Sequence, residues 1–100
     1  MEKQIEPQLN TKEAKDLYSV LAKLKKPQEI AEFLRDLLTL EEIEEAIRRF
    51  QVAKLLDKGE TFRQIALKTG MSSTTIARIN YWLHHGTRGY RSALRQLNSD

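Results

Sequence analysis

The sequence predicts a small all-α protein of six helices. Only four glycines and two prolines occur in 100 residues, and no stretch alternates apolar and polar residues as a strand does. Apolar residues instead recur at helical spacing in six successive segments. A chain of this length is sufficient for one domain.

Residues that start and stop helices divide the chain. We expect residues 1–10 to form a flexible arm. Thr11 can cap the first helix, and Pro27 suits the first turn of the second. Thr39 and Glu42 form a capping-box pattern before a third helix, which we expect to end at about Asp57 because Lys58-Gly59 follows.

Residues 61–82 have the spacing of a helix-turn-helix, the module that lays one helix in the DNA major groove. Thr61 can cap its first helix, and Ala66 is small where the two helices must approach closely. Gly70 permits a turn with positive φ, and Ser72 can cap the second helix. The apolar residues that then face the partner helix and the core are Ile65, Met71, Ile76 and Ile79. A last helix is expected over residues 87–97, after Thr87.

The two helices before residue 39 carry apolar stripes as strong as those at the centre of the chain. Short helices are marginal alone and need packing partners. We therefore expect residues 11–57 to be dimerisation helices that wrap around those of a second chain. The alternative is a compact monomeric bundle.

Charge is divided unevenly between the two halves. Residues 1–57 hold 10 Lys and Arg against 12 Asp and Glu, whereas residues 58–100 hold 7 against 2. The basic half contains the helix-turn-helix, and basic surfaces attract phosphates. A basic end without any nucleic-acid partner is the alternative. The absence of cysteine, of a membrane-length apolar run and of a signal peptide makes a cytoplasmic protein without a membrane partner the expectation.

Several segments occur together with the helix-turn-helix. They are Phe33–Thr39 (FLRDLLT), Glu41-Glu42-Ile43, Arg49–Leu56 (RFQVAKLL), Lys58-Gly59-Glu60 and Gly86–Tyr90 (GTRGY). In this combination the chain resembles the Trp repressor superfamily over about residues 30–95, and in particular its TrpR-like branch of YerC and YecD type. The resemblance implies a six-helix fold, an intertwined homodimer and a DNA-binding transcriptional regulator, here a repressor, acting on a palindromic operator.

The resemblance also locates a possible ligand pocket formed by Arg49, Arg78, Ile79 and Trp82. In the Trp repressor two arginines enclose the bound tryptophan, and they correspond to Arg49 and Arg78. A glycine after the second arginine is replaced by Ile79, and a serine near the ligand's amino group is replaced by Trp82. Because both replacements could fill the cavity, we expect that tryptophan does not control this protein. Gating by another, unknown small molecule stays an alternative.

The candidate DNA contacts lie on both helices of the motif. Ser and Thr can bond base edges or phosphates, and Ala and the Thr methyl suit a thymine methyl. Arg78 could contact guanine, hold a phosphate, or pair with a carboxylate of the third helix. The first helix of the motif crosses the DNA backbone in this class and offers phosphate contacts. The full set is Arg63, Gln64, Lys68, Ser72, Ser73, Thr74, Ala77, Arg78 and Tyr81.

Other chemistry finds no support in the sequence. Adjacent residues such as His84 and His85 point about 100° apart on a helix, so they cannot chelate one metal together. The acidic run at Glu41–Glu45 is explained by the helix dipole and solvation. We therefore expect no metal, no cofactor and no enzymatic activity. A dimeric protein-interaction module that has lost DNA binding is the alternative function.

Overall fold

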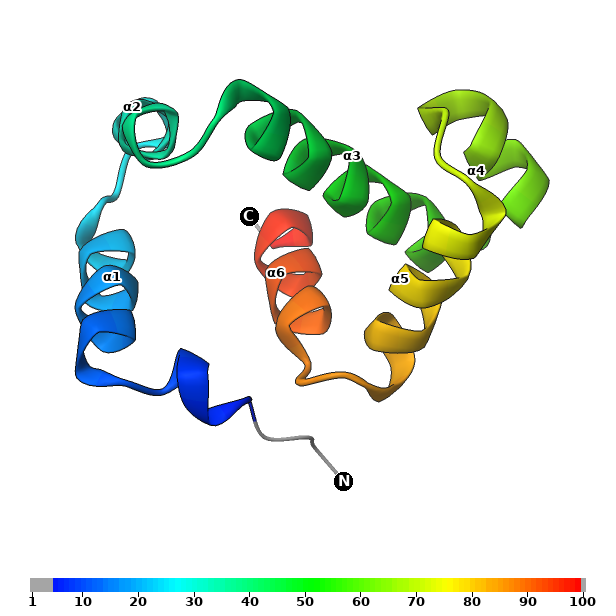
Figure 1. Ribbon diagram of the computed structural model, residues 1–100. Helices are drawn as coiled ribbons and strands as arrows, with labels where there is room; N and C mark the ends of the chain where they lie inside the picture. Colours follow the sequence, from blue (N-terminus) through cyan, green and yellow to red (C-terminus); the bar gives the residue numbers. More distant parts are fainter. Residues whose placement is uncertain (1–4, 100) are drawn as a thin grey trace. The chain divides into compact units, whose positions relative to one another are not determined.

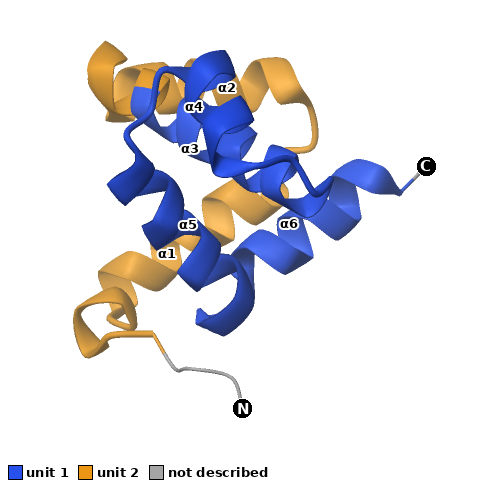
Figure 2. Ribbon diagram, turned by 90° about the vertical axis from the view of Figure 1, so that its right-hand side faces the viewer, with its two compact units in different colours: residues 1–3, 45–100 blue, residues 4–44 orange. Residues whose placement is uncertain are grey.

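The structure of the protein is a computed structural model that describes residues 5–99. Every regular element in that range is helical (Figure 1). The prediction of six α-helices is confirmed, with one short 3-10 helix added. The described chain divides after Glu44 into two compact units, which are coloured separately in Figure 2.

The N-terminal unit contains the 3-10 helix η1 (Pro7–Leu9), α1 (Lys12–Lys23), α2 (Pro27–Leu37) and the start of α3. Thr11 caps α1 as predicted, because its side-chain oxygen accepts a hydrogen bond from the Ala14 N–H at 3.1 Å. The arm predicted for residues 1–10 lies partly outside the described residues. Its later part is not a loose chain, since the Tyr18 hydroxyl donates to the Leu9 carbonyl at 2.8 Å.

Neither α1 nor α2 contains a buried residue. Apolar residues recur at helical spacing between charged ones, so each helix has one apolar face, yet several residues of these faces are exposed. The large apolar side chains exposed on the elements of this unit are Ile5, Leu9, Tyr18, Val20, Leu37 and Leu40. The unit thus has amphipathic helices but no dry core of its own in the single chain.

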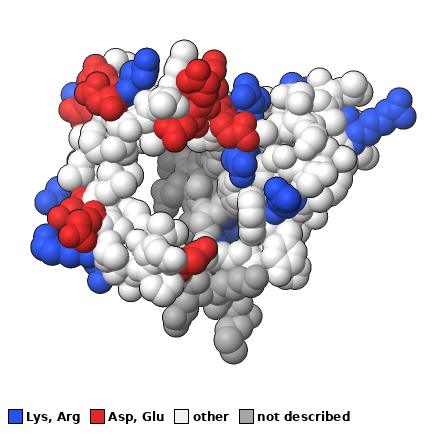
Figure 3. All heavy atoms as spheres, in the orientation of Figure 1, with Lys and Arg blue, Asp and Glu red and all other residues white. Residues whose placement is uncertain are grey.

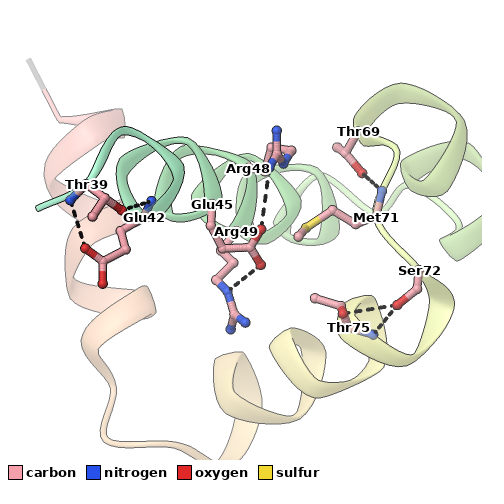
Figure 4. A network of polar contacts seen from close by, with 9 residues as sticks. All are labelled: Thr39, Glu42, Glu45, Arg48, Arg49, Thr69, Met71, Ser72 and Thr75. Carbon is pink, nitrogen blue, oxygen red and sulfur yellow. Dashed lines mark hydrogen bonds and ion pairs between the residues drawn. The ribbon is translucent and has the colours of Figure 1, made fainter.

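Helix α3 (Leu40–Asp57) passes from the N-terminal unit into the C-terminal unit. The predicted capping box is present at its start: the Glu42 N–H donates to Thr39 Oγ1 at 3.1 Å, and Glu42 Oε1 accepts from the Thr39 N–H at 2.8 Å (Figure 4). The helix ends as predicted, with Gly59 at φ 87° and its N–H bonded to the Leu56 carbonyl.

The C-terminal unit is completed by α4 (Phe62–Thr69), α5 (Ser73–His85) and α6 (Gly89–Asn98). Its core takes two side chains from the second half of α3, one from α4, three from α5 and one from α6. This core is the frame that fixes the position of α5. The buried residues are Val52, Ala53, Ile65, Ile76, Ile79, Leu83 and Leu94.

The connection between α5 and α6 contains a tight helix end and one residue at positive φ. Helix α5 runs on to His85, where the Gly86 N–H bonds to the Trp82 carbonyl at 2.9 Å. A Cβ on Gly86 would lie 2.5 Å from that carbonyl oxygen, so glycine is required here. The last helix, expected over residues 87–97 after Thr87, is α6 from Gly89, and the preceding Arg88 adopts the left-handed conformation with φ 75°.

Arg88 offers a first test of this geometry. A residue with a Cβ is strained at positive φ, whereas glycine is not. We therefore expect Arg88→Gly to have a higher free energy of unfolding than Arg88→Ala, by about 1 kcal/mol. Both variants lose the arginine side chain, so the difference reports the backbone alone. Urea unfolding of the pair measures it, and an alanine variant as stable as the glycine variant would show that φ at residue 88 is negative.

Candidate nucleic-acid interface

The turn between α4 and α5 is built from local hydrogen bonds. Gly70 ends α4 at φ 74°, and its N–H donates to the Ala66 carbonyl at 2.9 Å. Thr69 donates to the Ile65 carbonyl at 2.7 Å and accepts from the Met71 N–H at 3.2 Å. This arrangement satisfies the backbone groups that the end of a helix exposes.

Each helix of the motif also has the predicted N-terminal cap. Thr61 and Gln64 form a reciprocal capping box, with hydrogen bonds of 2.8 and 3.1 Å. Ser72 caps α5 by accepting from the Thr75 N–H at 3.2 Å, and its hydroxyl lies 3.1 Å from Thr75 Oγ1 (Figure 4). Ser72 is therefore committed to the helix start, although it was also a candidate DNA contact.

Helix α5 has one buried face and one exposed face. Ile76 and Ile79 are fully buried, and Leu83 continues the same stripe one turn later. Because Ile65 of α4 packs into the same core, α5 is held in a fixed orientation by apolar contacts. The exposed face carries five of the predicted contact residues, namely Ser73, Thr74, Ala77, Arg78 and Tyr81.

Arg78 is the only charged side chain on α5 apart from its histidines, and it is exposed. Within residues 5–99 its guanidinium makes no ion pair, whereas Arg49 of α3 pairs with Glu45 at 3.1 Å. The internal pairing considered for Arg78 is therefore not formed. Its five N–H donors stay available to an external acceptor.

The three candidate phosphate contacts of α4 differ in their surroundings. The Arg63 side chain is exposed, with no ion pair to any side chain in the described range. Lys68 lies 2.8 and 2.9 Å from the two carboxylate oxygens of Glu60, and Gln64 accepts in the capping box. Of these three side chains, Arg63 is thus the one most available to contact a phosphate.

The helix-turn-helix and the residues that follow it carry basic side chains and, up to Ser99, no acidic ones. From Thr61 to Ser99 the sequence contains six Lys and Arg and no Asp or Glu. In Figure 3 the part of the surface over α4 and α5 shows Lys and Arg without acidic side chains, which gather over other parts of this face. Such a surface attracts a polyanion through long-range Coulomb forces.

The residues of the predicted ligand pocket differ in burial. Ile79 is fully buried in the core while the preceding Arg78 is exposed, so the two side chains point to different sides of α5. Glu45 lies within ion-pair distance of both Arg49 and Arg48, as Figure 4 shows.

Trp82 does not belong to the core of the C-terminal unit, because 43% of its surface is exposed. The exposure of Trp82 follows from the angle between neighbouring side chains on a helix. Leu83 occupies the buried stripe, and its neighbour Trp82 points about 100° away. Near it, the Tyr81 and His85 rings lie 4.9 Å apart, which gives the end of α5 an exposed aromatic surface.

Tyr90 of α6 is half-buried against the core, and this burial raises its pKa above the ordinary value although Arg49 acts in the opposite direction. The ordinary tyrosine pKa is near 10. Because the Tyr90 pKa is higher in the folded state, its contribution to the free energy of unfolding is fully present below about pH 10 and is lost as the pH rises above that value. We expect Tyr90→Phe to remove one phenolate titration above about pH 10 and to flatten the fall of stability there. Ultraviolet titration of phenolate, with Tyr81→Phe as control, tests this.

One cluster was not anticipated from the sequence. Arg91 of α6 lies 3.0 Å from His84 Nδ1 of α5 and 3.8 Å from Asp57 Oδ1 at the end of α3. These partners are 7 and 34 residues away, so no local pattern announces them. The arginine therefore joins three helices of the C-terminal unit.

Residues 5–99 contain no group of three or more His, Cys, Asp or Glu side chains placed to hold a metal ion. In the same range no helix has both the length and the apolar character needed to cross a membrane.

Comparison with known proteins agrees with this architecture. The family model described as "Trp repressor protein" matches residues 12–98. YerC, an uncharacterized protein of Bacillus subtilis, is 36% identical over 89 residues, which cover 89% of this chain and 86% of YerC.

Two solved structures are similar over nearly their whole length. A TrpR-like protein from Eubacterium eligens has a TM-score of 0.86 at 36% identity, with 92% of this chain and 95% of that chain covered. A candidate Trp repressor from Staphylococcus aureus has a TM-score of 0.84 at 30% identity, with 97% and 98% covered. With six helices, a helix-turn-helix and a family match over most of its length, this chain belongs to the Trp repressor family.

Proposed function

We propose that this protein is a sequence-specific DNA-binding regulator of transcription that acts as a repressor, with α5 in the major groove. The observation that carries the proposal is the exposed, acid-free face of α5, held rigidly by a buried opposite face. Direct readout requires such a helix, with short polar side chains and an arginine facing outward. Membership of the Trp repressor family supports the same conclusion.

We propose that Arg78 and Thr74 read bases and that Arg63 contacts the phosphate backbone. Arg78 is uncommitted within the described chain, and Thr74 lies one turn earlier on the same exposed face. Arg63 is on α4, the helix that crosses the backbone in this class. Lys68 and Gln64 are weaker candidates, since Glu60 and the capping box already engage them.

The proposed active form is a homodimer. Helices α1 and α2 contain no buried residue, and Ile47 of α3 is 61% exposed. Apolar surface of this extent is removed from water most simply by a second copy with the same faces. Two recognition helices in a symmetric dimer would then meet successive major grooves about 34 Å apart on a palindromic operator.

We also propose that tryptophan does not gate this regulator. Ile79 fills the core at the position where the resemblance implies a glycine beside the ligand. Trp82 is exposed, so the proposal rests on Ile79 alone. A thermal-shift titration with tryptophan tests it: an unchanged melting temperature is expected, and a saturable increase would contradict the proposal.

Salt-dependent binding to duplex DNA tests the main proposal. Fluorescence anisotropy of a labelled duplex with mixed sequence is expected to show affinity that falls steeply as salt rises, because bound phosphates release counterions. Sedimentation of the same protein reports its oligomeric state. A folded dimer that binds no duplex even at low salt would contradict DNA binding and favour the protein-interaction alternative.

A further inference from the structure

We infer that a groove between the end of α3 and one face of α6 is a binding site for a phosphate-type oxyanion. The groove has a volume of about 190 Å³ and is lined by Asp57, Arg91, Leu94, Arg95 and Asn98. All five residues belong to the C-terminal unit. Four of them lie on α6, where Arg91 is three and four residues before Leu94 and Arg95, and Asn98 is four and three residues after them, so the four share one side of that helix.

The first guanidinium of the groove is already oriented. Arg91 Nη2 lies 3.0 Å from His84 Nδ1, and Arg91 Nη1 lies 3.8 Å from Asp57 Oδ1. With partners on both sides, this side chain loses less conformational entropy when a ligand binds. Its remaining N–H groups are still available, because a guanidinium has five donors.

The second guanidinium is uncompensated. Arg95 stands one turn after Arg91, and in residues 5–99 its side chain has neither an ion pair nor a hydrogen bond. The Asn98 amide adds a neutral donor one turn further along. Leu94, which is 4% exposed, adds an apolar side chain to a lining that otherwise consists of charged and amide groups.

The size and charge of the groove indicate the ligand class. Pockets for drug-sized ligands and cofactors are roughly 300–1,000 Å³, so this groove suits a small ion or a single phosphate group. Planar guanidinium forks match phosphate oxygens with two parallel hydrogen bonds. The one carboxylate, Asp57, opposes an anion but is outnumbered by two arginines and faces Arg91.

A phosphate titration followed by NMR at constant ionic strength tests the site. The wild-type chain is expected to show saturable shifts of the Arg91 and Arg95 Nε–Hε signals with phosphate and none with chloride. Arg95→Gln is expected to weaken phosphate binding about tenfold or more, since charge-assisted hydrogen bonds are lost. Asp57→Asn is expected to strengthen it, because the opposing charge is removed.

Arg35→Gln on α2 is the matched control, because it removes the same charge from the other unit and should leave phosphate affinity unchanged. Adding a short duplex distinguishes two sources of the oxyanion. Displacement of phosphate identifies the occupant as a backbone phosphate of DNA, and simultaneous binding identifies a free phosphate ion. The site does not depend on the proposed DNA function, since the phosphate titration stands without any duplex. Linear, unsaturated shifts, or equal affinity in the Arg95→Gln protein, would overturn the inference.

Discussion

Ile76→Ala is expected to lower the free energy of unfolding by about 2–5 kcal/mol, because deleting a buried branched side chain leaves a cavity. Ile76 is fully buried, and it packs with Ile65 of α4 in the core that fixes the recognition helix. A domain of this size has only about 5–15 kcal/mol of stability, so the variant loses a large share of it. Urea unfolding monitored by circular dichroism measures the loss.

Leu67→Ala is the matched control for this experiment. Leu67 is an apolar residue of the same motif but is 80% exposed, so its truncation should change stability by no more than about 0.5 kcal/mol. Ile76→Val should lie between the two, at about 0.5–1.5 kcal/mol. Equal losses at residues 67 and 76 would mean that the buried and exposed faces of the motif are assigned wrongly.

Arg78→Ala is expected to weaken binding to the preferred operator by about 1–3 kcal/mol, roughly five- to 150-fold, and to relax sequence preference at one base pair. Its guanidinium is exposed on α5, and no carboxylate of the described chain engages it. Fluorescence anisotropy with the operator and with single-base variants measures both effects.

Arg63→Ala provides the comparison for Arg78→Ala, because it removes the same charge from α4. A phosphate contact weakens all sequences uniformly and reduces the salt slope by about one. If Arg78→Ala also behaves in this way, Arg78 is a backbone contact and base reading must come from other residues of α5. If neither variant changes affinity, the proposed orientation of the motif is wrong.

The local parts of the fold could be predicted from the sequence because their causes are local. Capping needs a hydroxyl and a backbone N–H three residues apart, and Thr11, Thr39, Thr61 and Ser72 all supply it. The left-handed turn at Gly70 follows from the freedom of glycine. The buried stripe of α5 follows from the 3.6-residue period of its isoleucines.

The parts that failed depend on packing or on distant partners. The exposure of Trp82 could not be predicted, because an aromatic residue beside a buried stripe can lie on either side of its edge. Arg88 at positive φ gives no local signal, since arginine rarely adopts that conformation. The links of Lys68 to Glu60 and of Arg91 to Asp57 join separate elements, and no short pattern contains both partners.

The sequence predicted nine candidate DNA contacts, and the structure narrows them to a smaller set. Ser73, Thr74, Ala77, Arg78 and Tyr81 remain on the exposed face of α5. Ser72, Gln64 and Lys68 are engaged within the protein, which the sequence alone did not reveal because each residue type is also common in DNA contacts.

Selection of bound duplexes from a random-sequence pool tests the central claim most directly. If the protein is a dimer with α5 in the major groove, the selection should enrich a palindrome. Its half-sites should be about one helical turn, roughly 10 base pairs, apart. The same selection with Arg78→Ala should lose the preference at one position of each half-site. A pool that stays random while the protein is folded and dimeric would contradict sequence-specific DNA binding.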